Sequence, residues 1–182
     1  MKKIILTLLL LSFYIYGDST EIFLEYNFEN KINFKNNLSL EKEKNDLGLN
    51  MEFYSPPNGN LVGGFGIIHN KIELPYGEKL NLTTYYLVNK YYFGKSKIRM
   101  YGKLQAGGYY PSTVFEKTNI TKPQKIEIEN GFYYGTALGL EYRNFVLQSS
   151  YKGYNGDSKI NSEKTKLEYK TMALSLGYNL GM

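Results

Sequence analysis

Apolar and polar residues alternate with a period of two along most of the chain, the spacing of β-strands whose two faces meet different surroundings. Residues 22–28 begin the pattern, with Ile22 and Leu24 on one face and Glu21 and Glu25 on the other. The alternation predicts eight strands, over residues 22–28, 47–53, 61–67, 82–93, 98–106, 132–142, 145–152 and 172–180.

The connections between the predicted strands also alternate, short with long. The short ones are rich in glycine, proline and asparagine, the residues that tight turns require, and the long ones are polar. The short turns cover residues 55–60, 94–97 and 143–144, and the long connections cover residues 31–46, 71–80, 111–130 and 155–166.

Together the strand period and the order of connections predict an all-β fold. A soluble sandwich has no reason for strict alternation of connections, whereas a transmembrane barrel has short periplasmic turns and long extracellular loops. A sheet can cross lipid only when it closes, because every backbone group must be bonded within the protein. The prediction is an eight-stranded antiparallel up-and-down transmembrane β-barrel.

The two parities then predict two surfaces. The apolar parity should face lipid, and the other parity should fill the narrow interior of an eight-stranded barrel. Interior charges should be nearly balanced in sign, because an unpaired buried charge is very costly. The predicted lipid-facing residues are Ile98, Met100, Leu104, Leu138, Leu140, Leu174, Leu176 and Tyr178. The predicted polar plug of the interior is Glu25, Glu29, Glu52, Lys90, Arg99, Lys103, Glu141 and Lys152.

Glycine and tyrosine refine this expectation. Small inward residues should leave room for the long charged side chains: Gly48, Gly64, Gly66, Gly135, Gly139 and Gly177. Tyrosines near strand ends favour the aromatic girdles of membrane barrels. These tyrosines are Tyr85, Tyr86, Tyr91, Tyr92, Tyr109, Tyr110, Tyr133, Tyr134, Tyr142, Tyr151 and Tyr178. The facing of strand 82–93 stays open, because Asn89 shares its apolar parity.

The first segment has the layout of a secretory signal peptide. Lys2 and Lys3 precede a largely apolar run over residues 4–16, which ends at Gly17. The run is too short to cross the hydrocarbon core as a helix. The sequence therefore predicts a signal peptide over residues 1–17 and a barrel domain over residues 18–182, exported to the bacterial outer membrane.

Composition narrows the chemistry. The chain has 182 residues, no cysteine and one histidine, His69, so it lacks a thiol nucleophile, a Cys-based zinc site and any pair of His ligands. His69 falls on the lipid-facing parity and suits the headgroup level better than catalysis. We expect no enzyme activity, no cofactor and no metal. The excess of 22 basic over 17 acidic residues is spread along the chain, and no nucleic-acid partner is expected.

Several stretches resemble the small eight-stranded OmpA/OmpX-type outer-membrane barrels. Residues 86–93, the turn at 94–97 and residues 98–110 look like one barrel hairpin, and residues 132–145 look like the next. Residues 174–180 are similar to the terminal strand that barrel-assembly machinery reads, although Met182 stands where an aromatic residue is common. The resemblance implies contact with outer-membrane lipid and with that machinery. It also implies a non-enzymatic role in the envelope, in adhesion or in binding an extracellular partner through the loops.

Two alternative functions remain open from the sequence. A small-solute pore would share the fold, but a charged, filled interior argues against a wide channel. A soluble periplasmic lipocalin-like barrel would place an apolar cavity inside and the charges outside. In the long third connection, the alternation over residues 125–129 could extend the sixth strand beyond the membrane as a protruding hairpin.

Overall fold

The computed structural model describes residues 19–34, 38–41, 46–73, 79–94, 97–112, 115–117, 124–160 and 163–181. The predicted signal peptide, residues 1–17, lies outside these ranges. Within them, no helix is long and apolar enough to cross a membrane. The strands are β1 (Ser19–Phe34), β2 (Leu38–Glu41), β3 (Asp46–Tyr54), β4 (Leu61–Glu73), β5 (Lys79–Phe93), β6 (Ile98–Pro111), β7 (Phe115–Lys117), β8 (Gln124–Tyr142), β9 (Phe145–Ile160) and β10 (Glu163–Asn179).

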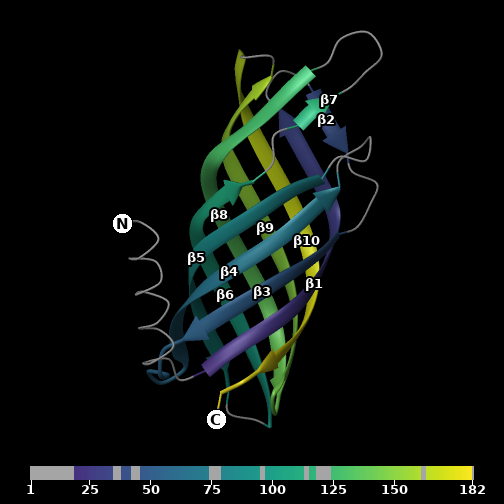
Figure 1. The fold of residues 1–182 in the computed structure, drawn as a ribbon. Helices are drawn as coiled ribbons and strands as arrows, with labels where there is room; N and C mark the ends of the chain where they lie inside the picture. The colour runs from purple at the N-terminus through teal and green to yellow at the C-terminus, as the bar shows by residue number, and fades with distance from the viewer. Residues whose placement is uncertain are drawn as a thin grey trace.

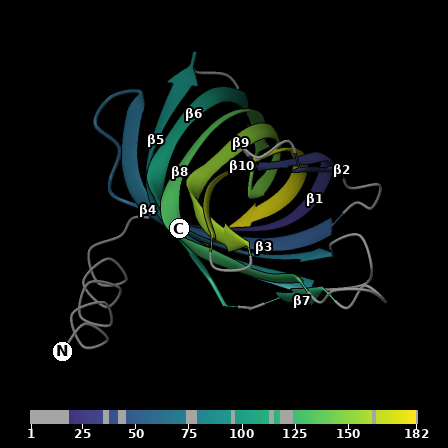
Figure 2. The ribbon, with the colours of Figure 1, turned by 90° about the horizontal axis from the view of Figure 1, so that it is seen from above.

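Eight of these strands close into one antiparallel barrel (Figure 1). The order around the barrel is β1-β3-β4-β5-β6-β8-β9-β10, and β10 pairs back onto β1 from Glu21↔Asn179 to Phe34↔Leu167. The view along the barrel shows the sheet curling round to meet itself (Figure 2). The short strands β2 and β7 lie outside this ring and pair with β1 and β8. The predicted fold class and all eight predicted strands are confirmed.

The two ends of the barrel differ. The turns at residues 55–60 and 143–144 and the turn residue Gly94 lie together with Ser19 and Gly181 around one opening of the barrel, and we call this end the turn end. Gly59 and Gly94 have φ of 65° and 84° there, which glycine adopts without strain. The strand ends that the other four connections join lie at the opposite end, which we call the loop end (Figure 1). The predicted alternation of connections is therefore present.

The strands continue well into the predicted loops, which corrects the expectation of long loops. β9 and β10 run to Ile160 and from Glu163, so most of the predicted connection over residues 155–166 is paired strand. β4 and β5 likewise leave only residues 74–78 between them. The apolar alternation fades here, but backbone pairing continues without it. Residues 124–129 extend β8, as the sequence suggested.

A wall of long strands rises at the loop end. β8 has 19 residues, β10 has 17, and β9 and β1 have 16 each, whereas β3 has 9. About 9–11 residues suffice to cross a membrane in a tilted strand. The four longest strands are neighbours, so their excess length forms one continuous sheet beyond the rest of the barrel (Figure 1).

Candidate functional site

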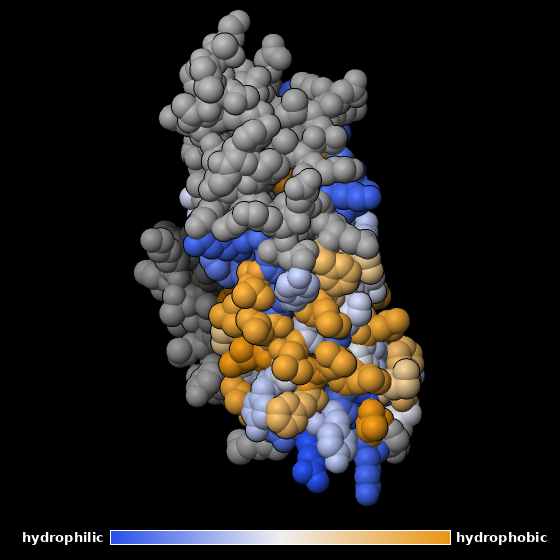
Figure 3. Space-filling view, turned by 90° about the vertical axis from the view of Figure 1, so that its right-hand side faces the viewer, coloured by the Kyte–Doolittle hydropathy of each residue, from blue (hydrophilic) through white to orange (hydrophobic). Residues whose placement is uncertain are grey.

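The outer face of the barrel carries an apolar belt, which is the first part of the candidate site. All the residues predicted to face lipid are exposed on this face, with Leu104 and Leu138 each 68% exposed. In the space-filling view the apolar side chains gather in a band between hydrophilic groups (Figure 3). The members are Ile98, Met100, Leu104, Leu138, Leu140, Leu174, Leu176 and Tyr178, joined by Leu24, Leu47, Leu49, Leu87, Leu147 and others.

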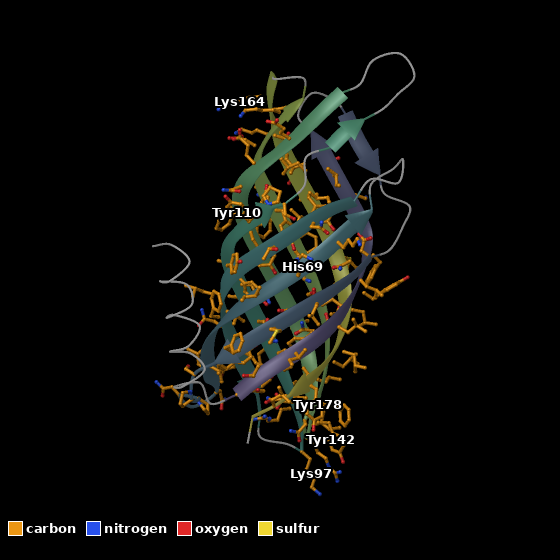
Figure 4. The ribbon with its side chains drawn as sticks, in the orientation of Figure 1. His69, Lys97, Tyr110, Tyr142, Lys164 and Tyr178 are labelled. Carbon is orange, nitrogen blue, oxygen red and sulfur yellow. The ribbon has the colours of Figure 1, made fainter. Side chains whose placement is uncertain are left out.

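The belt has limits at both ends. Tyr142 and Tyr178 lie toward the turn end, and Lys97 lies beyond them (Figure 4). On β10 the outward residues from Tyr178 to Met172 are apolar, and the next outward residue is Lys170. The six residue steps from Tyr178 to Met172, at ~3.4 Å each and a tilt of ~40°, give a height of roughly 16 Å, which fits within the apolar band of membrane barrels. Strand 82–93 turns Leu87, Asn89 and Tyr91 outward, which resolves its facing.

The interior of the turn-end half is filled by an alternating chain of charges. Lys103 Nζ lies 2.5 Å from Glu52 Oε2 and 3.2 Å from Glu21 Oε2. Lys90 Nζ lies 2.5 Å from Glu21 Oε1 and 3.2 Å from Glu141 Oε2. Each ion therefore contacts ions of the opposite sign, contributed by strands on different sides of the barrel, and these contacts hold the strands together across the interior.

Three further groups of the predicted plug differ in position. Lys152 pairs with Glu25 in a separate buried ion pair. Arg99 ends the charge chain by pairing with Glu141, but its side chain is 47% exposed because it sits at the turn-end opening. Its guanidinium packs 4.4 Å from the centre of the Tyr92 ring. The side chain of Glu29 lies outside the described part of the structure.

Glu21 is a central member of the charge chain that the predicted plug omits. It is fully buried and bridges Lys90 and Lys103. The signal was available, because Glu21 shares the inward parity of Glu25. With it, the described ion pairs of the interior join four carboxylates and four cations.

Uncharged side chains complete the hydrogen bonding of the buried carboxylates. Tyr54 donates a 2.5 Å hydrogen bond to Glu52, and Gln105 Nε2 donates to the same carboxylate at 2.9 Å. The Tyr86 hydroxyl lies 2.8 Å from Glu52 Oε1 and 2.7 Å from Asn50 Oδ1, and Asn50 in turn donates to Glu25. The charges are thus embedded in a satisfied network, the condition under which buried ions are tolerated.

Tyrosine fills much of the remaining interior, which corrects part of the predicted girdle. Tyr86, Tyr109 and Tyr133 are buried and point inward with Tyr154 and Tyr169, and Tyr92 is partly buried against this group. Their parity matches the inward set on each strand. The other girdle tyrosines, Tyr85, Tyr91, Tyr110, Tyr134, Tyr142, Tyr151 and Tyr178, belong to the outer face.

The inward glycines make room for aromatic rings and uncharged polar side chains rather than for charges. A Cβ at Gly66 would lie 2.2 Å from the Tyr86 ring, and one at Gly139 would lie 2.2 Å from the Tyr101 ring. A Cβ at Gly177 would lie 2.4 Å from Phe23. An added Cβ would meet the Phe53 carbonyl and the Tyr54 ring at Gly64, Gln105 and the Tyr133 hydroxyl at Gly135, and Asn70 at Gly48. The sequence correctly placed small residues inside the barrel, but the expectation that they make room for charged side chains is wrong, because the neighbouring side chains are uncharged.

Close packing leaves the largest interior side chains inaccessible to water. Tyr86, Tyr101, Tyr133, Lys103 and Lys152 are each less than 2% exposed. A cavity of about 680 Å³ opens at the turn end, lined by Glu21, Tyr54, Lys90, Arg99, Glu141 and Asn179 among others. Its floor is the charge chain itself.

His69 lies on the outer face and is exposed, about halfway along the barrel in Figure 4. Its Nδ1 lies 3.2 Å from the Thr83 hydroxyl. Within the described ranges, no group of three or more His, Cys, Asp or Glu side chains could hold a metal ion.

No protein-family model matches the sequence. An uncharacterized protein of Pasteurella multocida is 27% identical over 128 residues, which cover 58% of this chain and 52% of that protein. The chain thus spans about half the length of this curated relative.

Three solved structures share the fold. Neisserial surface protein A is 12% identical with a TM-score of 0.61, over 90% of this chain and 96% of its own. Ail, the attachment invasion locus protein of Yersinia pestis, is 16% identical with a TM-score of 0.53, over 90% and 99%. The outer membrane protein OprG of Pseudomonas aeruginosa is 12% identical with a TM-score of 0.51, over 92% and 98%. The chain therefore has the closed eight-stranded fold of bacterial outer-membrane β-barrels, as the resemblance seen in its sequence implied.

Proposed function

We propose that the protein is a non-enzymatic integral protein of the bacterial outer membrane that presents the loop-end wall to an extracellular partner. The observation that carries the proposal is the continuous apolar belt around a closed barrel whose interior holds the charges. A soluble lipocalin-like barrel requires the opposite polarity, with an apolar interior and a polar exterior. Exposed apolar bands of this extent are unfavourable in water and favourable in lipid.

In this proposal residues 1–17 direct export, the turn end faces the periplasm and the loop end faces outward. β10 carries the alternating pattern that barrel-assembly machinery would read, with Leu174, Leu176 and Tyr178 outward. The wall of β8, β9, β10 and β1 would stand beyond the membrane as a paired, and therefore rigid, surface. Ail, one of the proteins with this fold, is named for attachment and invasion, which fits a role of this kind.

The interior argues against a solute pore. Apart from Arg99 at the turn-end opening, the members of the charge chain are buried, and together with the buried tyrosines they occupy the cross-section. Their purpose in this proposal is structural: the ion pairs and hydrogen bonds join opposite sides of the barrel.

The membrane assignment is tested by fractionating cells that express the full chain and running the membrane extract unheated beside a boiled sample. We expect outer-membrane recovery and a change in gel migration on boiling. Recovery in the soluble fraction, with good solubility in plain buffer, would contradict the assignment.

The interaction role is tested separately by shortening the wall. Replacing residues 157–166 with a two-residue turn removes the outer part of the β9–β10 hairpin and leaves the belt intact, because Gly156 pairs with Leu167. We expect this variant to keep its heat-dependent migration while expressing cells lose attachment to host-cell matrix or to neighbouring bacteria. Equal attachment by both proteins would count against the interaction role.

A further inference from the structure

We propose that two copies of the barrel associate in the membrane through the outer face of β4, β5 and β6, with the Asn89 amides of the two copies bonded to each other. We call this surface the Asn89 face, and its members are Gly63, Leu87, Asn89, Tyr91 and Leu104. The inference goes beyond the proposed function but rests on it, because it requires the apolar belt to lie in hydrocarbon.

Asn89 is a polar residue in the middle of the apolar belt. It is exposed on the outer face of β5, and its outward neighbours along that strand are Leu87, 65% exposed, and Tyr91, 47% exposed. The next outward residues, Tyr85 and Phe93, each follow four residues away from Asn89. At a rise of ~3.4 Å and a tilt of ~40°, the amide lies roughly 10 Å along the barrel from each of them. Among the described residues, the amide has no hydrogen-bond partner.

Hydrocarbon cannot satisfy this amide. Acyl chains carry neither a donor nor an acceptor, and an unbonded amide in an apolar medium is costly. The asparagine side chain is also too short to reach the headgroups from the middle of the belt. The structure therefore points to a protein partner that places a donor and an acceptor at the same depth in the membrane.

Gly63, the β4 partner of Asn89, is a second and independent indication of close approach. A Cβ built there would meet only Asn89 Oδ1 at 3.8 Å and Ser55 Oγ at 3.9 Å, and the backbone has no positive φ. The inward glycines differ, since a Cβ at Gly66 or Gly139 would lie 2.2 Å from a tyrosine ring. Glycine weakens the interior of a strand and often marks the close approach of another backbone. One barrel alone does not require Gly63, whereas a closely packed second copy does.

Symmetry favours a second copy of this chain as the partner. Two copies inserted in the same direction are related by a two-fold axis along the membrane normal, so each residue lies at the depth of its counterpart. Asn89 can then meet Asn89, and because an amide donates through Nδ2 and accepts through Oδ1, the pair can form two reciprocal hydrogen bonds. Asparagine and glycine also occur where transmembrane helices associate, as hydrogen-bonding and close-approach residues. Leu87 and Leu104 would pack around the amide pair and exclude lipid.

The test measures energy transfer between donor-labelled and acceptor-labelled full chains in phospholipid vesicles, over a range of protein-to-lipid ratios. Since the chain has no cysteine, Lys97→Cys provides a single labelling site next to β6. We expect the chain with Asn89 to show more transfer than a random distribution, and unlabelled wild-type protein to reduce it. Asn89→Leu should need about tenfold more protein per lipid for half-maximal transfer, because the reciprocal hydrogen bonds are lost.

Further variants separate the hydrogen bonds from apolar packing. Asn89→Gln keeps an amide and should retain part of the association. Gly63→Leu keeps Asn89 but blocks close approach, and it should weaken association about tenfold as well. The matched control is Ser149→Leu, the same change from polar to leucine between Leu147 and Tyr151 on the outer face of β9, which should associate as the wild type does.

Heat-dependent gel migration and incorporation into vesicles are checked for every sample, so a failure of the membrane assignment is seen separately. Incorporated wild-type barrels with only random transfer at every ratio would overturn the inference, in favour of a different membrane protein as the partner of Asn89. Undiminished association of Asn89→Leu, or an equal loss in Ser149→Leu, would overturn it as well. If Asn89→Leu does not fold, Gly63→Leu and the dilution series of the wild type still decide the question.

Discussion

At the scale of single residues, the interior combines ions that are individually costly to bury. Glu52 and Lys103 have fully buried side chains, yet each contacts the other and further polar groups. Removing one member of such a pair leaves an uncompensated charge, whereas removing both leaves none. The pairs on the outer surface, such as Lys159 with Glu129 at 2.6 Å, are exposed and contribute little.

We expect Lys103→Met to lower the free energy of unfolding by roughly 3–5 kcal/mol, because Glu52 and Glu21 then lose a shared cation. The double variant Glu52→Gln/Lys103→Met should lose less than the sum of its single variants. Urea unfolding in detergent micelles measures these values, and Lys159→Gln, expected within about 1 kcal/mol of the wild type, is the control. Strict additivity of the two buried substitutions would argue against the charge chain.

The glycine–tyrosine contacts offer a second residue-scale prediction. Gly139→Ala places a methyl group against the Tyr101 ring inside the barrel, and we expect it to cost about 1–3 kcal/mol. Gly102→Ala on the outer face meets the edge of the Phe93 ring at 3.3 Å and Leu138 at 3.8 Å, both looser contacts, and should cost less. The same unfolding measurement compares them, and Tyr101→Leu should relieve the Gly139→Ala variant. Equal losses at both glycines would contradict the packing described.

At the scale of strands, the sequence predicted well which face of the sheet most side chains take. It did not predict where the strands end or which uncharged side chains fill the interior. Period-two alternation placed Leu104 and Lys103 on opposite faces, because lipid and a narrow lumen demand opposite polarity. Tyr86 and Tyr133 were expected in the girdle although their parity matches the inward set, because tyrosine suits both a girdle and a packed lumen. Nor could the alternation show that Arg99 lies at the turn-end opening, because the position of a side chain along the barrel depends on how the paired strands are aligned. Strand ends were missed where both faces are polar.

The belt makes a strand-scale prediction that distinguishes lipid from water. Leu104→Lys places a charge in the middle of the belt, and we expect a loss of about 2–4 kcal/mol in bilayers. Asn155→Lys, outward but beyond the belt, should be nearly neutral. Refolding into lipid vesicles across a denaturant series measures both. If Leu104→Lys were as stable as Asn155→Lys, the belt would not be in contact with hydrocarbon.

At the scale of the whole molecule, one closed sheet has two parts along its length, the part surrounded by the apolar belt and the part that extends beyond it. The part within the belt has its charges inside and its apolar groups outside, and the same strands continue beyond the belt with polar groups on the outer face. β8 makes this clearest, passing from Tyr142 at the turn end through Leu138 in the belt to Glu127 and Ile128 in the wall. The wall and the belt belong to the same hydrogen-bonded strands, so the outer groups of the wall are fixed relative to the belt.

The filled interior gives the last prediction, which concerns conduction. We expect the wild-type protein to show no steady conductance in planar bilayers, because the charge chain and the rings of Tyr86, Tyr101 and Tyr133 close the cross-section. Tyr101→Ala/Tyr133→Ala removes two of the largest interior side chains and is expected to produce brief small openings if the variant still folds, as judged by gel migration. Charge-chain variants such as Lys103→Met should change the ion preference of those openings, because Lys103 lies between Glu52 and Glu21. A stable wild-type conductance of porin size would require the interior side chains to rearrange. That result would contradict a purely structural role for the charge chain and would favour a pore function.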